Sequence, residues 1–503
     1  MKPLSEEILR DKIKGCFLGK NVGGTLGAPF EVDTNLQNVS FYTQELNGNP
    51  LPNDDLDLQL PWLILAEYYG LDHLTSRHFG EYWINAIIGP WGEYSNCRWN
   101  CLEGFFPPLS GACENDGLCV SNGAWIRSEI WACLCAGHPE NAIRYAWMDA
   151  SCDHKGDGIY AEMFIAAMEA AAFCCSDIRE LLKIGLANIP PAGRLRECIE
   201  LVIAGFDAGK DWQTVRNEVV EKNQDIGWFQ AAINVPFVVI ALLYGGGDFG
   251  KTVCLAVNCG DDTDCTGATA GAIIGIIQGA SALPEKWLTP IGEGIVTWSL
   301  NNFALPLPAP ANITELTQRI INVRKIAEIR DPQWGMPADD LYSSEMARSI
   351  WERPEYELRF DLLFARLDVE FPDGPYVKPG QPCRIKIKVR DSITPTGVIR
   401  LHWLLPENWV ADPAELRLGV RNFCQSVIEC SITPPEGVLD AMNYLYLEVR
   451  ADDRNAPVAV TIPLRNKAAY SFPRLYLDSK SDCWLRRCGA MRRIKGMAEK
   501  GRL

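Results

Sequence analysis

The sequence predicts an all-α domain followed by a small β-sandwich, and three observations lead to this prediction. Its 503 residues exceed the typical length of one domain, about 150 residues, roughly threefold. From residue 8 to about residue 298, apolar residues recur at helical spacing. After Pro354, short runs alternate between polar and β-branched or aromatic residues. We therefore predict an α domain over 1–353, an Ig-like β-sandwich over 354–468 and a basic C-terminal tail over 469–503.

The individual helices are predicted by small, apolar segments between loops that contain Gly, Pro and Asn. The clearest segments are 161–173, 231–244 and 266–278. The proline-rich stretch 304–310 predicts a stiff connector, after which apolar residues at helical spacing predict another helix over 313–329.

The segment 265–283 is apolar for nearly the length of a membrane span, and a glycine recurs in it every four residues. It follows the acidic run 261–264 without a basic anchor, and Gln278 interrupts it. We expect a buried helix and no membrane span. The glycine stripe would let a neighbouring backbone approach closely and so fix the position of whatever lies at the N-terminus of this helix.

The β-sandwich prediction depends on runs of alternating residues separated by turn residues at the usual spacing for that fold. The runs are 356–364, 383–389, 397–404, 426–432, 444–449 and 458–464.

The overall composition excludes several classes of protein. Hydrophobic residues make up 47% of the chain, enough for a sizeable core and too many for a disordered protein. The net charge of −16 argues against nucleic-acid binding, because a phosphate backbone would be repelled. The first seven residues lack the apolar core of a secretory signal, so we expect a cytoplasmic protein whose 19 cysteines are mostly buried and reduced.

Two acidic clusters, 53–57 (Asn-Asp-Asp-Leu-Asp) and 260–266 (Gly-Asp-Asp-Thr-Asp-Cys-Thr), each precede an apolar helical run. Carboxylates at a helix N-terminus can be simple caps. Two such clusters are harder to explain in this way, because several like charges held together repel one another. A hard divalent cation such as Mg²⁺ or Mn²⁺ would remove the repulsion, and thiol and imidazole ligands are scarce here. If the clusters face each other, their carboxylates suit a two-metal site.

Three further segments carry candidate functional residues. The glycine-containing segment 19–31 ends at Glu31, an acid that could bind a metal or move a proton. The loop at Ser121 and Asn122 leads into a helix with Arg127 one turn later, which suits a phosphate. The segment 149–158 contains His154, although a lone histidine is more often a satisfied core or surface residue.

These five elements, in this order, resemble the ADP-ribosylglycohydrolase family (dinitrogenase reductase-activating glycohydrolase-like). The family motifs are G-x-x-x-G-D-x-L-G-x-x-x-E, T-D-D, N-G-x-x-x-R, A-S-x-x-H and G-x-D-x-D-T, and the likeness covers roughly residues 8–300. The resemblance implies an all-helical fold with two Mg²⁺ ions in a cleft, which bind the ribose diol and position its anomeric bond for cleavage.

The resemblance also implies roles for particular residues. By position, Asp54 and Asp55 match the T-D-D carboxylates, Asp262 and Asp264 the D-x-D ligands, Glu31 the glutamate of the first motif, and Gly123, Arg127 and His154 the phosphate and ribose contacts. Three positions depart from the pattern: Gly24 stands for Asp, Asn53 for Thr and Cys265 for Thr. A thiol is a poor match for a hard ion, and Thr266 is the neighbouring oxygen donor.

Our leading hypothesis is a metal-dependent glycosidase that hydrolyses the anomeric bond of an ADP-ribosyl or related furanosyl substrate. One or two Mg²⁺ ions, or Mn²⁺, would be held by residues from the two acidic clusters: Asn53, Asp54, Asp55, Asp262, Asp264, Cys265 and Thr266. The catalytic carboxylate would be Glu31 or Asp57. Substrate contacts are expected from Ser121, Asn122, Gly123, Arg127 and His154. Two alternatives are a glycoside hydrolase for a non-nucleotide furanoside and a non-catalytic protein that binds ADP-ribose or another sugar; the oligomeric state stays open.

Overall fold

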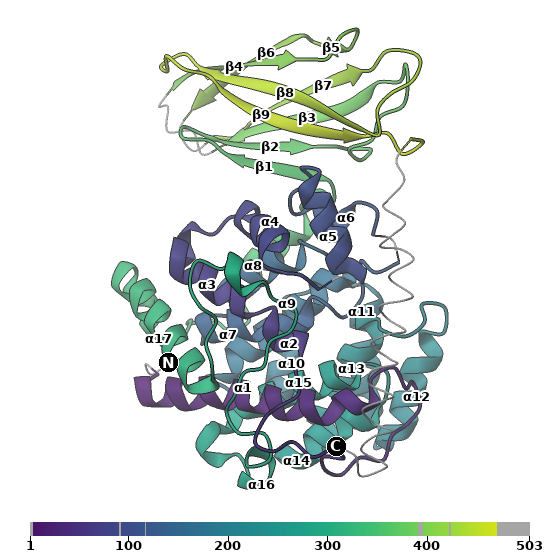
Figure 1. Ribbon diagram of the computed structural model, residues 1–503, viewed down its shortest axis with the longest axis vertical. Coiled ribbons are helices and arrows are strands. Elements are labelled where there is room, and N and C mark those ends of the chain that lie inside the picture. Colours follow the sequence, from purple (N-terminus) through teal and green to yellow (C-terminus); the bar gives the residue numbers. More distant parts are fainter. Residues whose placement is uncertain (1–3, 90–91, 116, 391–395, 422–423, 470–503) are drawn as a thin grey trace.

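The computed structural model describes residues 4–89, 92–115, 117–390, 396–421 and 424–469. The basic tail predicted for 469–503 lies outside these residues except for Ala469. The described chain forms a helical body that carries two antiparallel β-sheets at one end (Figure 1). The predicted fold class is therefore confirmed.

The helical body contains the segments predicted as helices, and its helices vary from one turn to six. They are α1 (Glu6–Gly27), α2 (Asp54–Asp57), α3 (Leu60–Tyr69), α4 (Ser76–Asn85), α5 (Gly92–Leu102), α6 (Leu109–Ala112), α7 (Glu129–Leu134), α8 (Pro139–Ala150), α9 (Asp157–Ala172), α10 (Ile178–Ala187), α11 (Arg194–Asp207), α12 (Trp212–Lys222), α13 (Ala231–Gly245), α14 (Phe249–Asn258), α15 (Thr263–Gln278), α16 (Glu285–Leu288), α17 (Ile313–Arg330) and α18 (Glu345–Trp351). Within the described ranges, no helix is both long and apolar enough to cross a membrane.

Helices α1 and α15 lie side by side and antiparallel, in backbone contact (Figure 1). A Cβ atom on the glycines of either helix would overlap the facing carbonyl; the facing pairs are Gly15 with Gly275, Gly19 with Gly271, and Gly23 with Gly267. This register brings the C-terminal end of α1 to the N-terminal end of α15. The chain that follows α1, including Glu31, therefore reaches the first turn of α15.

The β region consists of two sheets with a shared apolar core. Its strands are β1 (Glu357–Asp361), β2 (Arg366–Glu370), β3 (Cys383–Arg390), β4 (Thr396–Leu404), β5 (Val410–Asp412), β6 (Glu415–Arg421), β7 (Ser426–Thr433), β8 (Met442–Ala451) and β9 (Val458–Arg465). One sheet has the order β1-β2-β3-β7-β5 and the other β6-β4-β8-β9. The sequence did not predict β2, β5 and β6, which are short or rich in charged residues.

The two regions meet in a packed junction. The side chain of Arg465 is completely buried there, donates to Asn100 Oδ1 at 2.9 Å, and lies over the ring of Phe105, 4.5 Å from its centre. Leu109 and Cys113 of the helical body join the apolar core of the β region. The β region therefore contacts the segment around α5 and α6 directly.

Candidate functional site

The two acidic segments converge in the interior of the helical body. Single oxygen atoms of Glu31, Asp262 and Asp264 lie within 4.8 Å of one another. Atoms of Asp55, Asp264 and Cys265 form a second group of the same size. All five residues are buried, and Asp264 belongs to both groups. The expected convergence of segments 53–57 and 260–266 is therefore observed, and the two groups are adjacent.

The short helix α2 presents Asp55 to this cluster. Asn53 is its N-cap, and its Oδ1 accepts a hydrogen bond from Asp55 N at 2.7 Å. Asp57 Oδ2 accepts hydrogen bonds from the backbone of Trp298 at 2.7 Å and of Ser299 at 2.8 Å, which holds that segment against α2. Burial raises the pKa of Asp57 to about 7.

The loops that carry Glu31 and Asp262 are fixed to each other. Val32 has φ 82° and Asp261 has φ 69°, a left-handed conformation that costs about 1–3 kcal/mol for residues other than glycine. Val32 N donates to Asp261 O at 2.9 Å, and Asp261 N donates to Asp33 O at 2.9 Å. The strain is retained at the point where the end of α1 meets the start of α15, so the packing of those helices determines the position of Glu31.

The cluster is electrostatically unfavourable without a cation. Burial raises the pKa of Asp262 well above its ordinary value, and neighbouring Asp264 and Glu31 raise it further. Burial likewise raises the pKa of Asp55, although Lys20, whose Nζ lies 3.9 Å from Asp55 Oδ2, opposes this. Within the described structure, Asp55 Oδ2 and Asp262 Oδ1 are buried and accept no hydrogen bond. Oxygen atoms of this kind fit a hard divalent cation.

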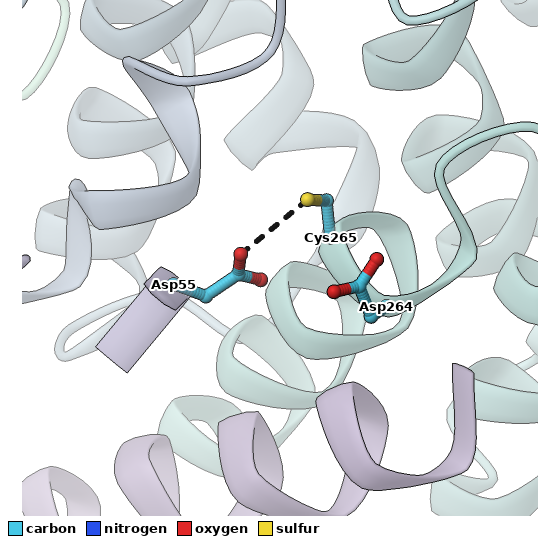
Figure 2. Close-up of side chains that lie close together, drawn as sticks. All are labelled: Asp55, Asp264 and Cys265. Atoms are coloured by element: carbon cyan, nitrogen blue, oxygen red, sulfur yellow. Dashed lines mark hydrogen bonds between the residues drawn. The ribbon is translucent and has the colours of Figure 1, made fainter. Parts of the chain in front are cut away.

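Cys265 faces this cluster and Thr266 does not. Cys265 Sγ lies 3.3 Å from Asp55 Oδ1 (Figure 2). Thr266 Oγ1 instead lies 3.4 Å from the carbonyl oxygens of Thr263 and Ala256. A cation between Asp55 and Asp264 would therefore meet a sulfur atom at this position.

Two of the departures from the family pattern fit together in space. A Cβ atom on Gly24 would overlap the side-chain amide of Asn53. An aspartate at position 24 would therefore require another residue, or another side-chain orientation, at position 53.

The loop at 121–123 lies directly beside the acidic cluster. Asn122 Nδ2 donates to Asp262 Oδ2 at 2.7 Å. Ser121 Oγ donates to Glu93 Oε1 at 2.7 Å and lies 3.0 Å from His154 Nε2. His154 is buried, and it borders a cavity of about 430 Å³. Ser121 and His154 thus share one hydrogen-bonded network, and Asn122, the next residue along the chain, bonds to Asp262.

Arg127, like this loop, is completely buried. Its Nε donates to Asp149 at 2.7 Å and its Nη2 donates to Asp153 at 2.6 Å. Its Nη1 also donates to the carbonyl of Gly123. Asp153 in turn lies 2.8 Å from His154 Nδ1. In this arrangement Arg127 positions Gly123 and His154 from behind.

Three buried polar residues, Lys20, Glu129 and Glu93, were not among the sequence candidates. Lys20 Nζ lies 2.8 Å from Glu129 Oε1 and donates to the carbonyl of Ile126 at 2.7 Å, so it connects α1 to the chain before α7. Glu93 on α5 completes the network of Ser121. Lys20 lies within the glycine-containing segment singled out above, but its burial depends on the packing of α1 and has no local sequence signal.

This chain is therefore a helical protein in which carboxylates from two distant segments meet in a buried cluster that could hold a metal ion. The sequence profile of the ADP-ribosylglycohydrolase family matches residues 5–325, and the chain belongs to this family.

Two known proteins give the scale of the similarity. ADP-ribosylarginine hydrolase Tri1 of Pseudomonas putida (strain GB-1) is 23% identical over 309 residues, which cover 57% of this chain and 76% of the relative. A solved chain described as "ADP-ribosylglycohydrolase-related protein complex" is 17% identical, with a TM-score of 0.42 over 63% of this chain and 99% of the other.

Proposed function

We propose that this protein is a metal-dependent hydrolase that cleaves the anomeric bond of an ADP-ribosyl group. The main supporting observation is the position of Asp264, which belongs to two adjacent groups of buried ligand-type atoms. Family membership supports the ADP-ribosyl substrate class.

The cation residues divide into two sets in this proposal. Asp262 and Asp264 would hold one ion with Glu31 beside it, and Asp55, Asp264 and Cys265 would hold the other, with Asp54 next to them. When bound, Mg²⁺ or Mn²⁺ would supply positive charge to hold vicinal hydroxyl groups of the ribose and to stabilise negative charge that develops there.

The remaining roles belong to the chain itself. Glu31 follows directly from the end of α1 and is fixed beside Asp262, so it is our first candidate for the carboxylate that moves a proton; Asp57 is the second. Asn122 orients Asp262 through its amide. The cavity beside His154, about 430 Å³, falls within the usual size range of small-molecule sites and would receive part of the substrate.

The leaving group is proposed from the named relative. Because Tri1 is described as an ADP-ribosylarginine hydrolase, an arginine-linked ADP-ribosyl peptide is the first substrate to test.

The experiment measures release of ADP-ribose from that peptide by the full chain with Mg²⁺, with Mn²⁺ and with a chelator. Release that depends on the metal and is lost in Asp264→Asn supports the proposal. Turnover of aryl furanosides alone would instead indicate a non-nucleotide glycoside hydrolase. Saturable binding of ADP-ribose in a calorimeter without turnover, with Mn²⁺ present, would indicate a binding protein.

A further inference from the structure

A second cavity lies where the helical body meets the β region, and most of the charged residues that line it are basic. It has a volume of about 310 Å³. Five arginines line it, from α8, from the chain after α18 and from three neighbouring strands: Arg144, Arg353, Arg359, Arg366 and Arg390. In a chain with a net charge of −16, such a concentration of positive charge is unexpected.

Among the residues that the structure describes, three carboxylates pair with arginines of this set of five. Glu357 is shared between Arg353 and Arg359. Asp368 is shared between Arg359, at 2.9 Å, and Arg390. Each of these two buried acids therefore serves two guanidinium groups, and positive charge remains in excess around the cavity.

Asp361 is the acid that lines the cavity itself, and it pairs with Arg366 at 2.8 Å. This pair neutralises one lining arginine and leaves the others unchanged.

The sheet places two of the arginines directly opposite each other. Arg366 of β2 is the register partner of Arg390 of β3. Like charges at opposed positions destabilise a sheet unless they are compensated, and here Asp361 pairs with Arg366 and Asp368 with Arg390. The Nε atoms of Arg353 and Arg390 are also buried without a hydrogen-bond partner among the described residues. Burial lowers the pKa of Arg353 to about 10, although its ion pair with Glu357 opposes this.

From this geometry we propose that the interdomain cavity binds a small molecule that carries a phosphate group. Arginine donors match phosphate oxygens in pairs, and several arginines around one cavity are the usual way to hold such a group. The volume suits a phosphate ester of about nucleotide size or smaller. Trp147 lines the same cavity, and Arg353 lies over its ring, 4.1 Å from the ring centre, so this aromatic ring and the guanidinium together form part of the wall.

The proposal does not depend on the hydrolase assignment, because none of the lining residues belongs to the acidic cluster. It does connect the two regions: the ligand would contact β1, β2 and β3 on one side and α8 on the other. Trp147, Ile350 and Arg353 also border the cavity beside His154, so the two cavities share a wall.

The test is calorimetric titration of the full chain with inorganic phosphate, pyrophosphate and AMP, at constant ionic strength and with a chelator to keep divalent cations from the acidic cluster. The variant is Arg366→Gln combined with Arg390→Gln. The control is Arg417→Gln on β6, whose side chain is 64% exposed and pairs with Glu415. We expect saturable binding that is at least tenfold weaker in the double variant and unchanged in the control and in Asp264→Asn.

The three probes show which part of a phosphate-containing ligand the cavity recognises. Equal affinity for phosphate and AMP means that the phosphate group alone is recognised, and tighter binding of AMP means that the aromatic wall takes part. If the double variant does not fold, as judged by circular dichroism, each single variant should still weaken binding severalfold. Undiminished binding in the folded variants, or no saturable binding of any of the three probes to the wild-type chain, overturns the proposal.

Discussion

The helical body contains two buried clusters of carboxylates, and they differ in where their positive charge comes from. Around Arg127, the guanidinium contacts Asp149 and Asp153 at 2.7 Å and 2.6 Å. Burial alone would raise the pKa of Asp153, but Arg127 and His154 lower it below its ordinary value. In the acidic cluster, the neighbouring carboxylates Asp264 and Glu31 raise the pKa of Asp262 in the same direction as burial does, while the hydrogen bond from Asn122 opposes them.

The difference separates a structural cluster from a binding site. Carboxylates that the chain itself neutralises contribute to the fold, and their loss leaves a buried charge unpaired. Carboxylates that mainly repel one another contribute nothing to the fold unless a cation arrives from solution. The degree of internal neutralisation is thus a better guide to the cation site than the number of acids.

The largest effect is expected from replacing Arg127, the side chain that neutralises Asp149 and Asp153. Arg127→Gln should lower the free energy of unfolding by about 3–5 kcal/mol, because Asp149 and Asp153 would remain buried without their partner. Urea denaturation followed by circular dichroism measures this change. Arg179→Gln, which removes an exposed ion pair with Asp207, should cost less than about 1 kcal/mol. Equal losses in the two variants would contradict the comparison.

In the acidic cluster, Asp264→Asn should abolish activity without lowering the free energy of unfolding. Loss of a residue that belongs to both ligand groups should lower kcat/KM more than ~100-fold, the upper range found for residues that only support metal ligands. The free energy of unfolding of the metal-free protein should stay equal or rise, because one repulsive charge is gone. The matched control is Asp211→Asn, which keeps the cap of α12. A destabilised Asp264→Asn protein would show that the cluster is structural.

Added metal should stabilise the wild-type protein. At a free Mg²⁺ or Mn²⁺ concentration of 100 Kd, binding to the native state alone adds about 2.7 kcal/mol. Differential scanning calorimetry with metal and then with excess chelator measures the gain and its reversal. Asp264→Asn should show almost no shift, whereas Asp211→Asn should behave like the wild type. An identical shift in both variants would place the cation elsewhere.

The identity of residue 265 should tune the choice of metal. Because oxygen suits Mg²⁺ better than sulfur does, Cys265→Thr should bind Mg²⁺ about tenfold more tightly than the wild type. Any excess of Mn²⁺ affinity over Mg²⁺ affinity should become smaller. Isothermal titration with each metal tests this, with Cys198→Thr in α11 as a buried control distant from the cluster in sequence. Unchanged Mg²⁺ affinity would mean that the sulfur of Cys265 stays outside the coordination sphere.

The smallest effect concerns a surplus acid beside Arg127. Burial, and then Asp149, raise the pKa of Glu162 well above its ordinary value, so the folded protein holds a proton that the unfolded chain releases near pH 4.5. Stability from this group is therefore greatest below that pH and falls as the pH rises. Glu162→Gln cannot titrate and should therefore lose less stability than the wild type between pH 5 and pH 8. Parallel denaturation curves at the two pH values would contradict this.

Local patterns in the sequence were sufficient to predict the fold class and the pairing of the two acidic segments. Helical periodicity located α9, α13, α15 and α17, and the glycine stripe of α15 correctly indicated close backbone contact. Strand β6 was missed although Leu416, Leu418 and Val420 alternate, because charged residues separate them.

Features that depend on tertiary packing were not predictable. Lys20 is buried only because α1 passes beside α7, and Gly24 and Asn53 reveal their relation only in space. Of the arginines that line the cavity between the helical body and the β region, Arg144 is far from the others in the chain, and each alone resembles an ordinary solvated charge. Whether Arg127 touches a substrate stays a prediction, since its contacts in the structure are to Asp149, Asp153 and Gly123.

The backbone contact between α1 and α15 affects which substitutions the acidic cluster can tolerate. Because main-chain atoms set the spacing of these helices, the positions of Glu31 and Asp264 are insulated from changes of side-chain volume elsewhere. Side chains elsewhere in the interior can then be substituted while the geometry of the acidic cluster is kept. A single methyl group added at Gly19 or Gly271 would push the two helices apart and would disturb the acidic cluster more than many substitutions in the surrounding core.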